Sequence, residues 1–107
     1  MRVLLDECIP RPLRRAFPAH DVRTIRDMGW AGKKNGELLA LMAADGFEVL
    51  LTVDRSIRHQ QDLSAAGVAV VVMVAASNRL PGRLPVVPAV EAALAFVQPG
   101  NAVEGKA

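Results

Sequence analysis

Residues 68–74 read Val-Ala-Val-Val-Val-Met-Val, a run that is apolar throughout and mostly β-branched. β-Branched side chains favour strands, and a strand without polar alternation is typical of a sheet that is covered on both faces. Two shorter and mainly apolar runs, residues 2–5 and 47–52, resemble it, and residues 21–26 alternate polar and apolar side chains. The sequence therefore predicts four strands, at least one of them buried on both faces.

Segments with helical patterns separate these strands. Asn35 is a suitable N-cap for one of them, and Gly46 and Gly67 stand where glycine commonly ends a helix. Strands that alternate with helices favour a mainly parallel sheet with helices on both faces. We therefore expect an α/β fold, a three-layer α/β/α sandwich around a mainly parallel sheet of four to five strands. The predicted helices cover residues 9–17, 35–44, about 55–66 and 89–97.

The chain of 107 residues is long enough for one domain. We assign residues 1–98 to this domain and residues 99–107 to a C-terminal tail, with a short edge strand at its start as an alternative. The longest apolar run, residues 68–76, is about half as long as a bilayer span. Acids also follow the first strand where a signal peptide would be apolar. We therefore expect a cytoplasmic protein without a membrane partner.

Acidic residues follow the strands at one edge of the predicted sheet. Asp6 and Glu7 follow the first strand, Asp54 follows the third, and Glu37 opens the helix after the second. Ligands of open α/β sheets bind beyond the carboxyl ends of the strands. Each acid alone is explained as a cap, but carboxylates about 4 Å apart repel by roughly 1 kcal/mol in water and about 4 kcal/mol at an effective dielectric constant of 20. A gathered set therefore indicates a cation, and oxygen ligands without a neighbouring His or Cys favour Mg²⁺ or Mn²⁺.

Basic residues are concentrated near the beginning of the chain. Residues 1–34 hold eight of the thirteen Lys and Arg, and the net charge is +2. Arginine suits phosphate groups, so the pattern fits a footprint on a phosphate backbone, although on charge alone a solvated helix face is the simpler interpretation. Tyr is absent and the chain has one Trp and three Phe, which argues against a base-stacking surface. The candidate residues for binding a nucleic-acid backbone, which would be RNA by the family resemblance given below, are Arg11, Arg14, Arg15, Lys33, Lys34, Arg55 and Arg79.

Three motifs, in this order, resemble the short bacterial PIN-like domains. They are residues 4–10 (Leu-Leu-Asp-Glu-Cys-Ile-Pro), 28–39 (Met-Gly-Trp-Ala-Gly-Lys-Lys-Asn-Gly-Glu-Leu-Leu) and 51–55 (Leu-Thr-Val-Asp-Arg). The resemblance covers about residues 1–98, and the ordered set is more specific than any single motif.

The resemblance implies a PIN-like fold and a Mg²⁺- or Mn²⁺-dependent endoribonuclease, the toxin of a bacterial toxin–antitoxin pair. Asp6, Glu37 and Asp54 would be its catalytic, metal-binding acids. An RNA substrate is implied, and a small antitoxin partner and a homodimer are consistent with it. PIN nucleases often carry a fourth acid, which this chain lacks near its third and fourth strand ends. Secondary site candidates are Glu7, Ser77 and Asn78.

Two other classes of protein stay open. A receiver-like signalling domain would use Asp6 and Glu7 as its acidic pair and Asp54 as its phospho-acceptor, with Ser77 after the fourth strand. It leaves Glu37 without a role, and the sequence predicts no lysine at the end of a fifth strand. A catalytically inactive PIN-like module that binds RNA or protein is the third interpretation, with the acids acting only as caps.

Overall fold

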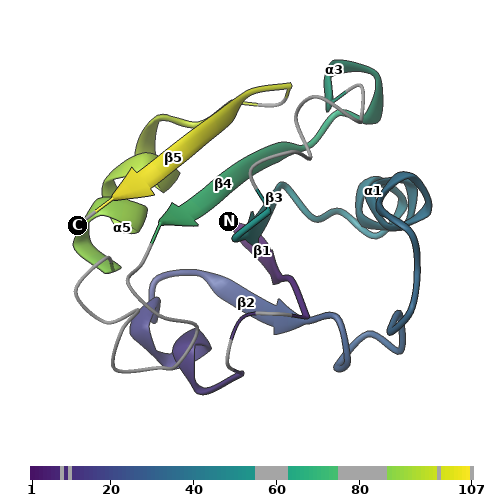
Figure 1. Cartoon of the computed structure of the whole chain (residues 1–107), viewed down its shortest axis with the longest axis horizontal. Coiled ribbons are helices and arrows are strands. Elements are labelled where there is room, and N and C mark those ends of the chain that lie inside the picture. Colours follow the sequence, from purple (N-terminus) through teal and green to yellow (C-terminus); the bar gives the residue numbers. More distant parts are fainter. Residues whose placement is uncertain (8, 10, 55–62, 75–86, 99, 107) are drawn as a thin grey trace.

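The computed structural model describes residues 1–7, 9, 11–54, 63–74, 87–98 and 100–106 (Figure 1). Within these residues, five parallel strands form one sheet in the order β2-β1-β3-β4-β5. The order reverses at β1, because the chain passes from β1 to β2 on one side and returns to β3 on the other. The strands are β1 (Arg2–Leu5), β2 (Asp21–Thr24), β3 (Val49–Thr52), β4 (Ala69–Val74) and β5 (Ala102–Lys106).

Helices cover both faces of the sheet, and α1 and α5 lie on opposite sides of it (Figure 1). Alternate residues of β1 explain the two cores: Val3 and Leu5 pack on the side of η1 and α5, whereas Leu4 packs on the side of α1. All three side chains are at most 1% exposed. The predicted three-layer α/β/α sandwich is therefore confirmed. The helical elements are η1 (Arg11–Ala16, a 3-10 helix), α1 (Asn35–Ala44), α3 (Leu63–Ala66) and α5 (Val87–Phe96).

The end of α1 follows the glycine signal in the sequence. Gly46 has a φ of 82°, and the N–H of Phe47 donates to the carbonyl of Met42 at 2.9 Å. Met42 and Phe47 are both buried in the same core cluster, which is the usual apolar contact of this type of helix end. The beginning of α1 differs from the prediction: Lys34 is the N-cap residue, without a side-chain cap, and Asn35 is already helical.

The C-terminal residues form an edge strand, the alternative to a plain tail, and this strand occupies Ala102–Lys106. β5 pairs along β4 in parallel, from Ala102 beside Val70 to Lys106 beside Val74. The N–H of Gly100 also donates to the carbonyl of Val68 at 2.9 Å. Ala102 and Val103 pack on opposite core clusters, so this short segment covers an edge that β4 would otherwise leave open.

The first predicted helix also differs from the structure, and another predicted helix is described only in part. The first helix is a 3-10 helix from Arg11 to Ala16, shorter than the predicted 9–17. Of the helix predicted at about 55–66, residues 55–62 lie outside the described part of the chain. Across the described part, no helix has both the length and the apolar composition that a membrane crossing requires.

Candidate active site

Asp6 stands at the carboxyl end of β1, where the strand order reverses. Its backbone N–H donates to the carbonyl of Leu51 at 2.9 Å, so it still belongs to the sheet. Its carboxylate accepts two hydrogen bonds, from the N–H of Glu7 at 2.8 Å and from the hydroxyl of Thr52 at 2.6 Å. A point of strand-order reversal is where open α/β sheets bind their ligands. Asp6 is therefore a half-buried carboxylate in a fixed orientation at this point.

Thr52 connects Asp6 to Asp54. Thr52 is the last residue of β3 and is fully buried. Its hydroxyl donates to Asp6 Oδ2 and accepts the backbone N–H of Asp54 at 3.1 Å. Two of the three acids predicted for the site thus follow neighbouring strands, and one hydroxyl bonds the carboxylate of Asp6 and the backbone of Asp54.

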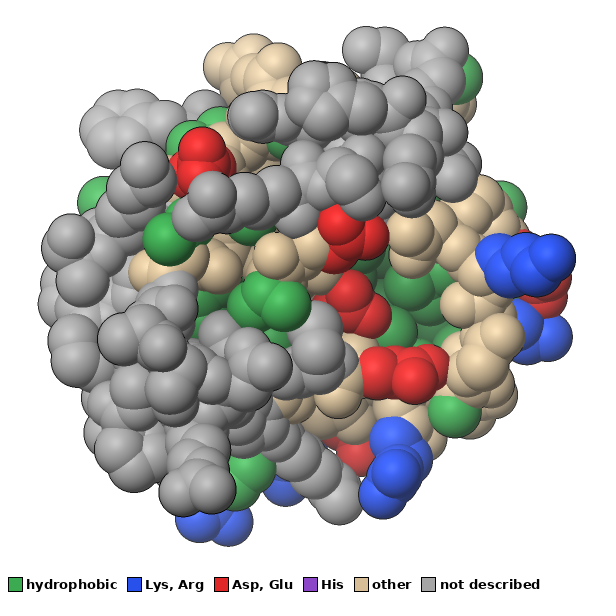
Figure 2. All heavy atoms as spheres, viewed as in Figure 1, with side chains coloured by type: hydrophobic (Ala, Val, Ile, Leu, Met, Phe, Trp, Pro, Cys, Tyr) green, Lys and Arg blue, Asp and Glu red, His purple; other side chains and the backbone are tan. Residues whose placement is uncertain are grey.

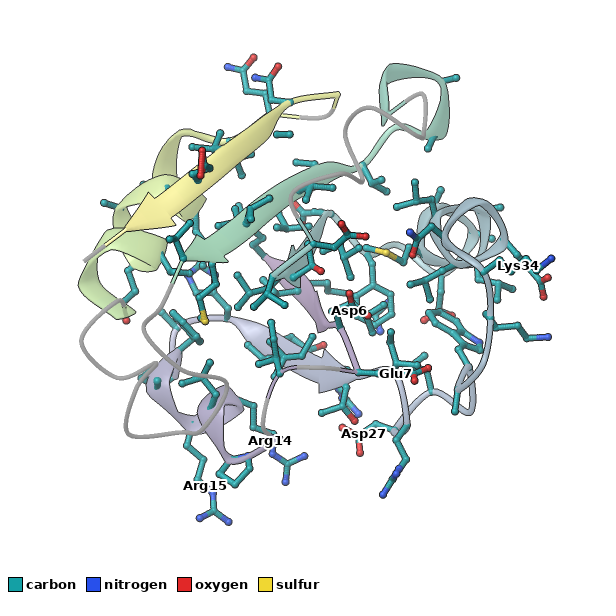
Figure 3. The ribbon with its side chains drawn as sticks, viewed as in Figure 1. Asp6, Glu7, Arg14, Arg15, Asp27 and Lys34 are labelled. Atoms are coloured by element: carbon teal, nitrogen blue, oxygen red, sulfur yellow. The ribbon has the colours of Figure 1, made fainter. Side chains whose placement is uncertain are left out.

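A pocket of about 340 Å³ opens beside Asp6. Figure 2 shows Asp and Glu side chains in a row across this face of the molecule, and Figure 3 shows Glu7 next to Asp6. Glu7 Oε1 accepts the N–H of Gly32 at 2.9 Å, which ties this carboxylate to the loop after β2. We call this space the carboxylate pocket; its lining residues are Asp6, Glu7, Ile9, Thr24, Ile25, Arg26 and Ala31.

The end of β2 and the turn after it line the carboxylate pocket together with Asp6 and Glu7. The N–H of Thr24 donates to Asp27 Oδ2 and the N–H of Asp27 donates to the Thr24 hydroxyl, both at 3.0 Å. Arg14 lies 3.5 Å from the same carboxylate oxygen of Asp27. Thr24, Arg26 and Thr52 were not among the predicted site residues. The spacing Thr24-x-x-Asp27 is a reciprocal capping pattern that could have indicated this turn.

Glu37 does not line the carboxylate pocket. It lies in the first turn of α1, its side chain is 56% exposed, and Oε1 is 2.9 Å from Lys33 Nζ. Among the residues that the structure describes, no three His, Cys, Asp or Glu side chains are placed to hold one metal ion together. The structure therefore does not bring Asp6, Glu37 and Asp54 into one three-carboxylate group. The loop of ten residues between β2 and α1 separates Glu37 from the strand end.

The donor set at Asp6 nevertheless fits one kind of metal site. Magnesium is commonly bound through one or two carboxylates, with water and substrate phosphates completing its shell. Asp6 provides one carboxylate, and Glu7 or Asp54 a second. Each Asp6 oxygen accepts one of the hydrogen bonds described above, which leaves lone pairs for a metal because a carboxylate has about four acceptor positions. The residues fit a hydrated Mg²⁺ or Mn²⁺ ion, and do not form a closed cage.

The Lys and Arg residues that were predicted to bind RNA are distributed unevenly around the carboxylate pocket. Arg14 and Arg15 lie on η1, and Lys34 lies on the opposite side of the acidic row (Figure 3). Lys33 is paired with Glu37. The remaining predicted site and RNA-binding residues lie outside the described part of the chain: Arg55, Ser77, Asn78, Arg79 and the side chain of Arg11.

The clearest electrostatic perturbation lies on the outer strand β2. Arg23 Nε donates to Asp21 Oδ1 at 2.9 Å, and this hydrogen bond lowers the pKa of Asp21 and raises the pKa of Arg23. Arg2 Nε lies 3.4 Å from the other oxygen of Asp21 and lowers its pKa further. The cluster joins the beginnings of β1 and β2, at the opposite end of the strands from Asp6.

Comparison with known proteins identifies one family. The model of the PIN-like domain family matches residues 1–76, which include Asp6, Glu7, Glu37 and Asp54. No curated protein and no solved structure matches the chain.

Proposed function

The chain belongs to the PIN-like domain family, and from this premise we propose that it is an endoribonuclease that uses Mg²⁺ or Mn²⁺. PIN-like domains have a nuclease-type fold, and the observation in this chain that supports the proposal is the carboxylate pocket. Asp6 is held there by the Thr52 hydroxyl, beside Glu7, at the reversal of strand order. This is the position at which the fold class binds its ligands.

Some residues of the pocket would bind the metal ion, and others would hold the metal-binding carboxylates in place. Asp6 would hold the metal ion directly, with Glu7 or Asp54 as a second carboxylate. When bound, such an ion supplies an activated water and neutralises charge on the phosphodiester. Thr52 would keep the Asp6 carboxylate in one orientation by donating to Oδ2. The hydrogen bond from Gly32 would restrict Glu7 in the same way.

The decisive experiment is cleavage of labelled RNA by the purified chain. We expect cleavage with Mg²⁺ or Mn²⁺ and none with EDTA, and a loss on the order of a hundredfold in Asp6→Asn. Glu91→Gln is the matched control, because Glu91 is an exposed carboxylate on α5 that does not line the pocket. Cleavage by Asp6→Asn at the wild-type rate, or no cleavage by the wild type, would overturn the proposal.

A pair of variants decides which glutamate takes part. The resemblance assigns Glu37, whereas the pocket favours Glu7. We expect Glu7→Gln to lower the cleavage rate more than Glu37→Gln, because Glu37 is exposed and paired with Lys33. If Glu37→Gln is as harmful as Asp6→Asn, the active site uses Asp6, Glu37 and Asp54, and Glu37 leaves Lys33 in the active protein.

We further propose that this ribonuclease is the toxin of a bacterial toxin–antitoxin pair that acts in the cytoplasm. A small antitoxin partner and a homodimer belong to this proposal, and its support is the sequence resemblance. Induced expression of the wild type should arrest growth, whereas Asp6→Ala should not. Equal growth arrest by both proteins would show that the toxicity does not depend on catalysis, and would contradict the proposal.

A receiver-like domain is the second candidate, and two observations favour it. β5 ends at Lys106, so a lysine does stand at the end of a fifth parallel strand. The strand order 2-1-3-4-5 is also that of receiver domains. Incubation with a small phosphodonor distinguishes the two functions. Phosphorylation of Asp54 without RNA cleavage would support the receiver, and neither activity would leave a binding module.

A further inference from the structure

Arg26 differs from the other described cations in its surroundings. It lines the carboxylate pocket and is exposed. Among the described residues, no carboxylate is paired with Arg26, Arg15 or Lys34, and of these three only Arg26 lines the pocket. Four other cations are each paired with a carboxylate: Arg2, Arg14, Arg23 and Lys33.

The two acids that line the pocket with Arg26, and the acid next to it in the chain, each have other partners. Both oxygens of Asp6 accept hydrogen bonds, from Glu7 N–H and from Thr52. Glu7 Oε1 accepts the N–H of Gly32. Asp27, the next residue, is bonded to Thr24 and paired with Arg14. Arg26 therefore lines the same pocket as Asp6 and Glu7, and within the described part of the chain it forms an ion pair with neither of them.

The backbone around Arg26 is fixed, although its side chain is exposed. The carbonyl of Arg26 accepts the N–H of Gly29 at 3.1 Å. The Thr24–Asp27 bonds described above close the turn on the other side. An exposed arginine that pairs with no carboxylate among the described residues leaves its guanidinium available to a ligand.

We propose that Arg26 binds a backbone phosphate of the RNA that enters the carboxylate pocket. The inference rests on the proposed ribonuclease function and adds to it a substrate-binding residue. A guanidinium matches phosphate oxygens with two parallel hydrogen bonds, and no ion pair of Arg26 within the described residues has to be broken first. The RNA backbone would thus lie between Asp6 and Glu7 on one side and Arg26 on the other. Figure 2 shows a row of Asp and Glu side chains on this face of the molecule, with Lys and Arg side chains around it.

The test measures RNA binding without cleavage. A fluorescent single-stranded RNA is titrated in EDTA at several salt concentrations with the wild type, Arg26→Gln, Arg26→Lys and Arg23→Gln. Arg23 is the matched control, because it is a nearby arginine that is paired with Asp21 and does not line the pocket. We expect Arg26→Gln to weaken binding about tenfold, and the slope of log K against log salt to shrink by about 0.7, the value for one lost phosphate contact on a single strand.

The remaining outcomes are equally specific. Arg26→Lys should bind with intermediate affinity, because it keeps the charge and loses the paired hydrogen bonds. Arg23→Gln should bind within about twofold of the wild type. The inference is overturned if Arg26→Gln binds like the wild type, if Arg23→Gln loses as much, or if the wild type does not bind RNA. If the binding loss is found but no metal-dependent cleavage occurs, the phosphate site stands and the ribonuclease proposal fails.

Discussion

Replacement of Thr52 by valine should remove the hydrogen bond that joins the Asp6 carboxylate to β3, while keeping the shape of the core. Valine has the size of threonine, but it cannot donate to Asp6 Oδ2 or accept the N–H of Asp54. Asp6 would keep its bond from Glu7 N–H but would be free to rotate about its side-chain torsions. We expect both stability and activity to fall, and activity to fall more than stability explains.

The size of each effect follows from the two bonds. A hydrogen bond to a charged group contributes about 1.5–3 kcal/mol and a neutral one about 1 kcal/mol. Water replaces part of the loss at Asp6, which is half-buried, and the added methyl group favours the apolar interior. We therefore expect the free energy of unfolding to fall by about 2 kcal/mol and the melting temperature by about 8 °C. The cleavage rate at 25 °C should fall about tenfold, which corresponds to 1.4 kcal/mol of transition-state stabilisation.

Two companion variants make the result interpretable. Thr52→Ser keeps the hydroxyl and should retain most of the activity. Val49→Ala lies at the other end of the same strand, is buried, and should lose a comparable amount of stability, about 2 kcal/mol, without loss of cleavage. Melting is followed by circular dichroism and cleavage with labelled RNA. If Thr52→Val cleaves like Val49→Ala, Thr52 does not position Asp6.

Three further predictions concern the fold. The hydrogen bond from Arg23 lowers the pKa of Asp21 below its ordinary value of 3.8, so the stability that this bond contributes is present above pH 3.8 and disappears as the pH falls through the lowered pKa. Arg23→Gln should therefore melt at a lower temperature than the wild type at pH 6. A difference in melting temperature that persists in strong acid would contradict this. Gly46→Ala should destabilise by about 1 kcal/mol because of the positive φ, whereas Gly36→Ala inside α1 should be neutral or stabilising in the same denaturant titration. A chain that ends at residue 98 lacks β5 and should melt at a clearly lower temperature, whereas a true tail could be removed without effect.

The layered architecture could be predicted because its signal is local. The central strands are apolar on both faces, as residues 49–52 and 69–74 are, and such runs require cover on both sides. The neighbourhood of Asp6 and Asp54 also followed from topology, because both residues come directly after parallel strands that pair with each other.

Other features depend on tertiary contacts that a local pattern does not contain. β5 carries few apolar residues and is a strand because β4 offers it an open edge. The position of Glu37 depends on the path of the loop before α1. That path is set by distant contacts, such as the edge-on packing of Trp30 on Phe47 at 5.8 Å and the bond from Gly32 to Glu7.

The bond from the Asp6 amide to the Leu51 carbonyl limits how the pocket can adapt. This amide completes the ladder between β1 and β3, so Asp6 cannot advance toward a bound molecule unless the two strands slide apart. Its hydrogen should exchange with solvent only when the centre of the protein opens. Adjustment to a bound molecule must therefore come from side chains that can change rotamer, such as the exposed side chain of Arg26 on the other wall of the pocket.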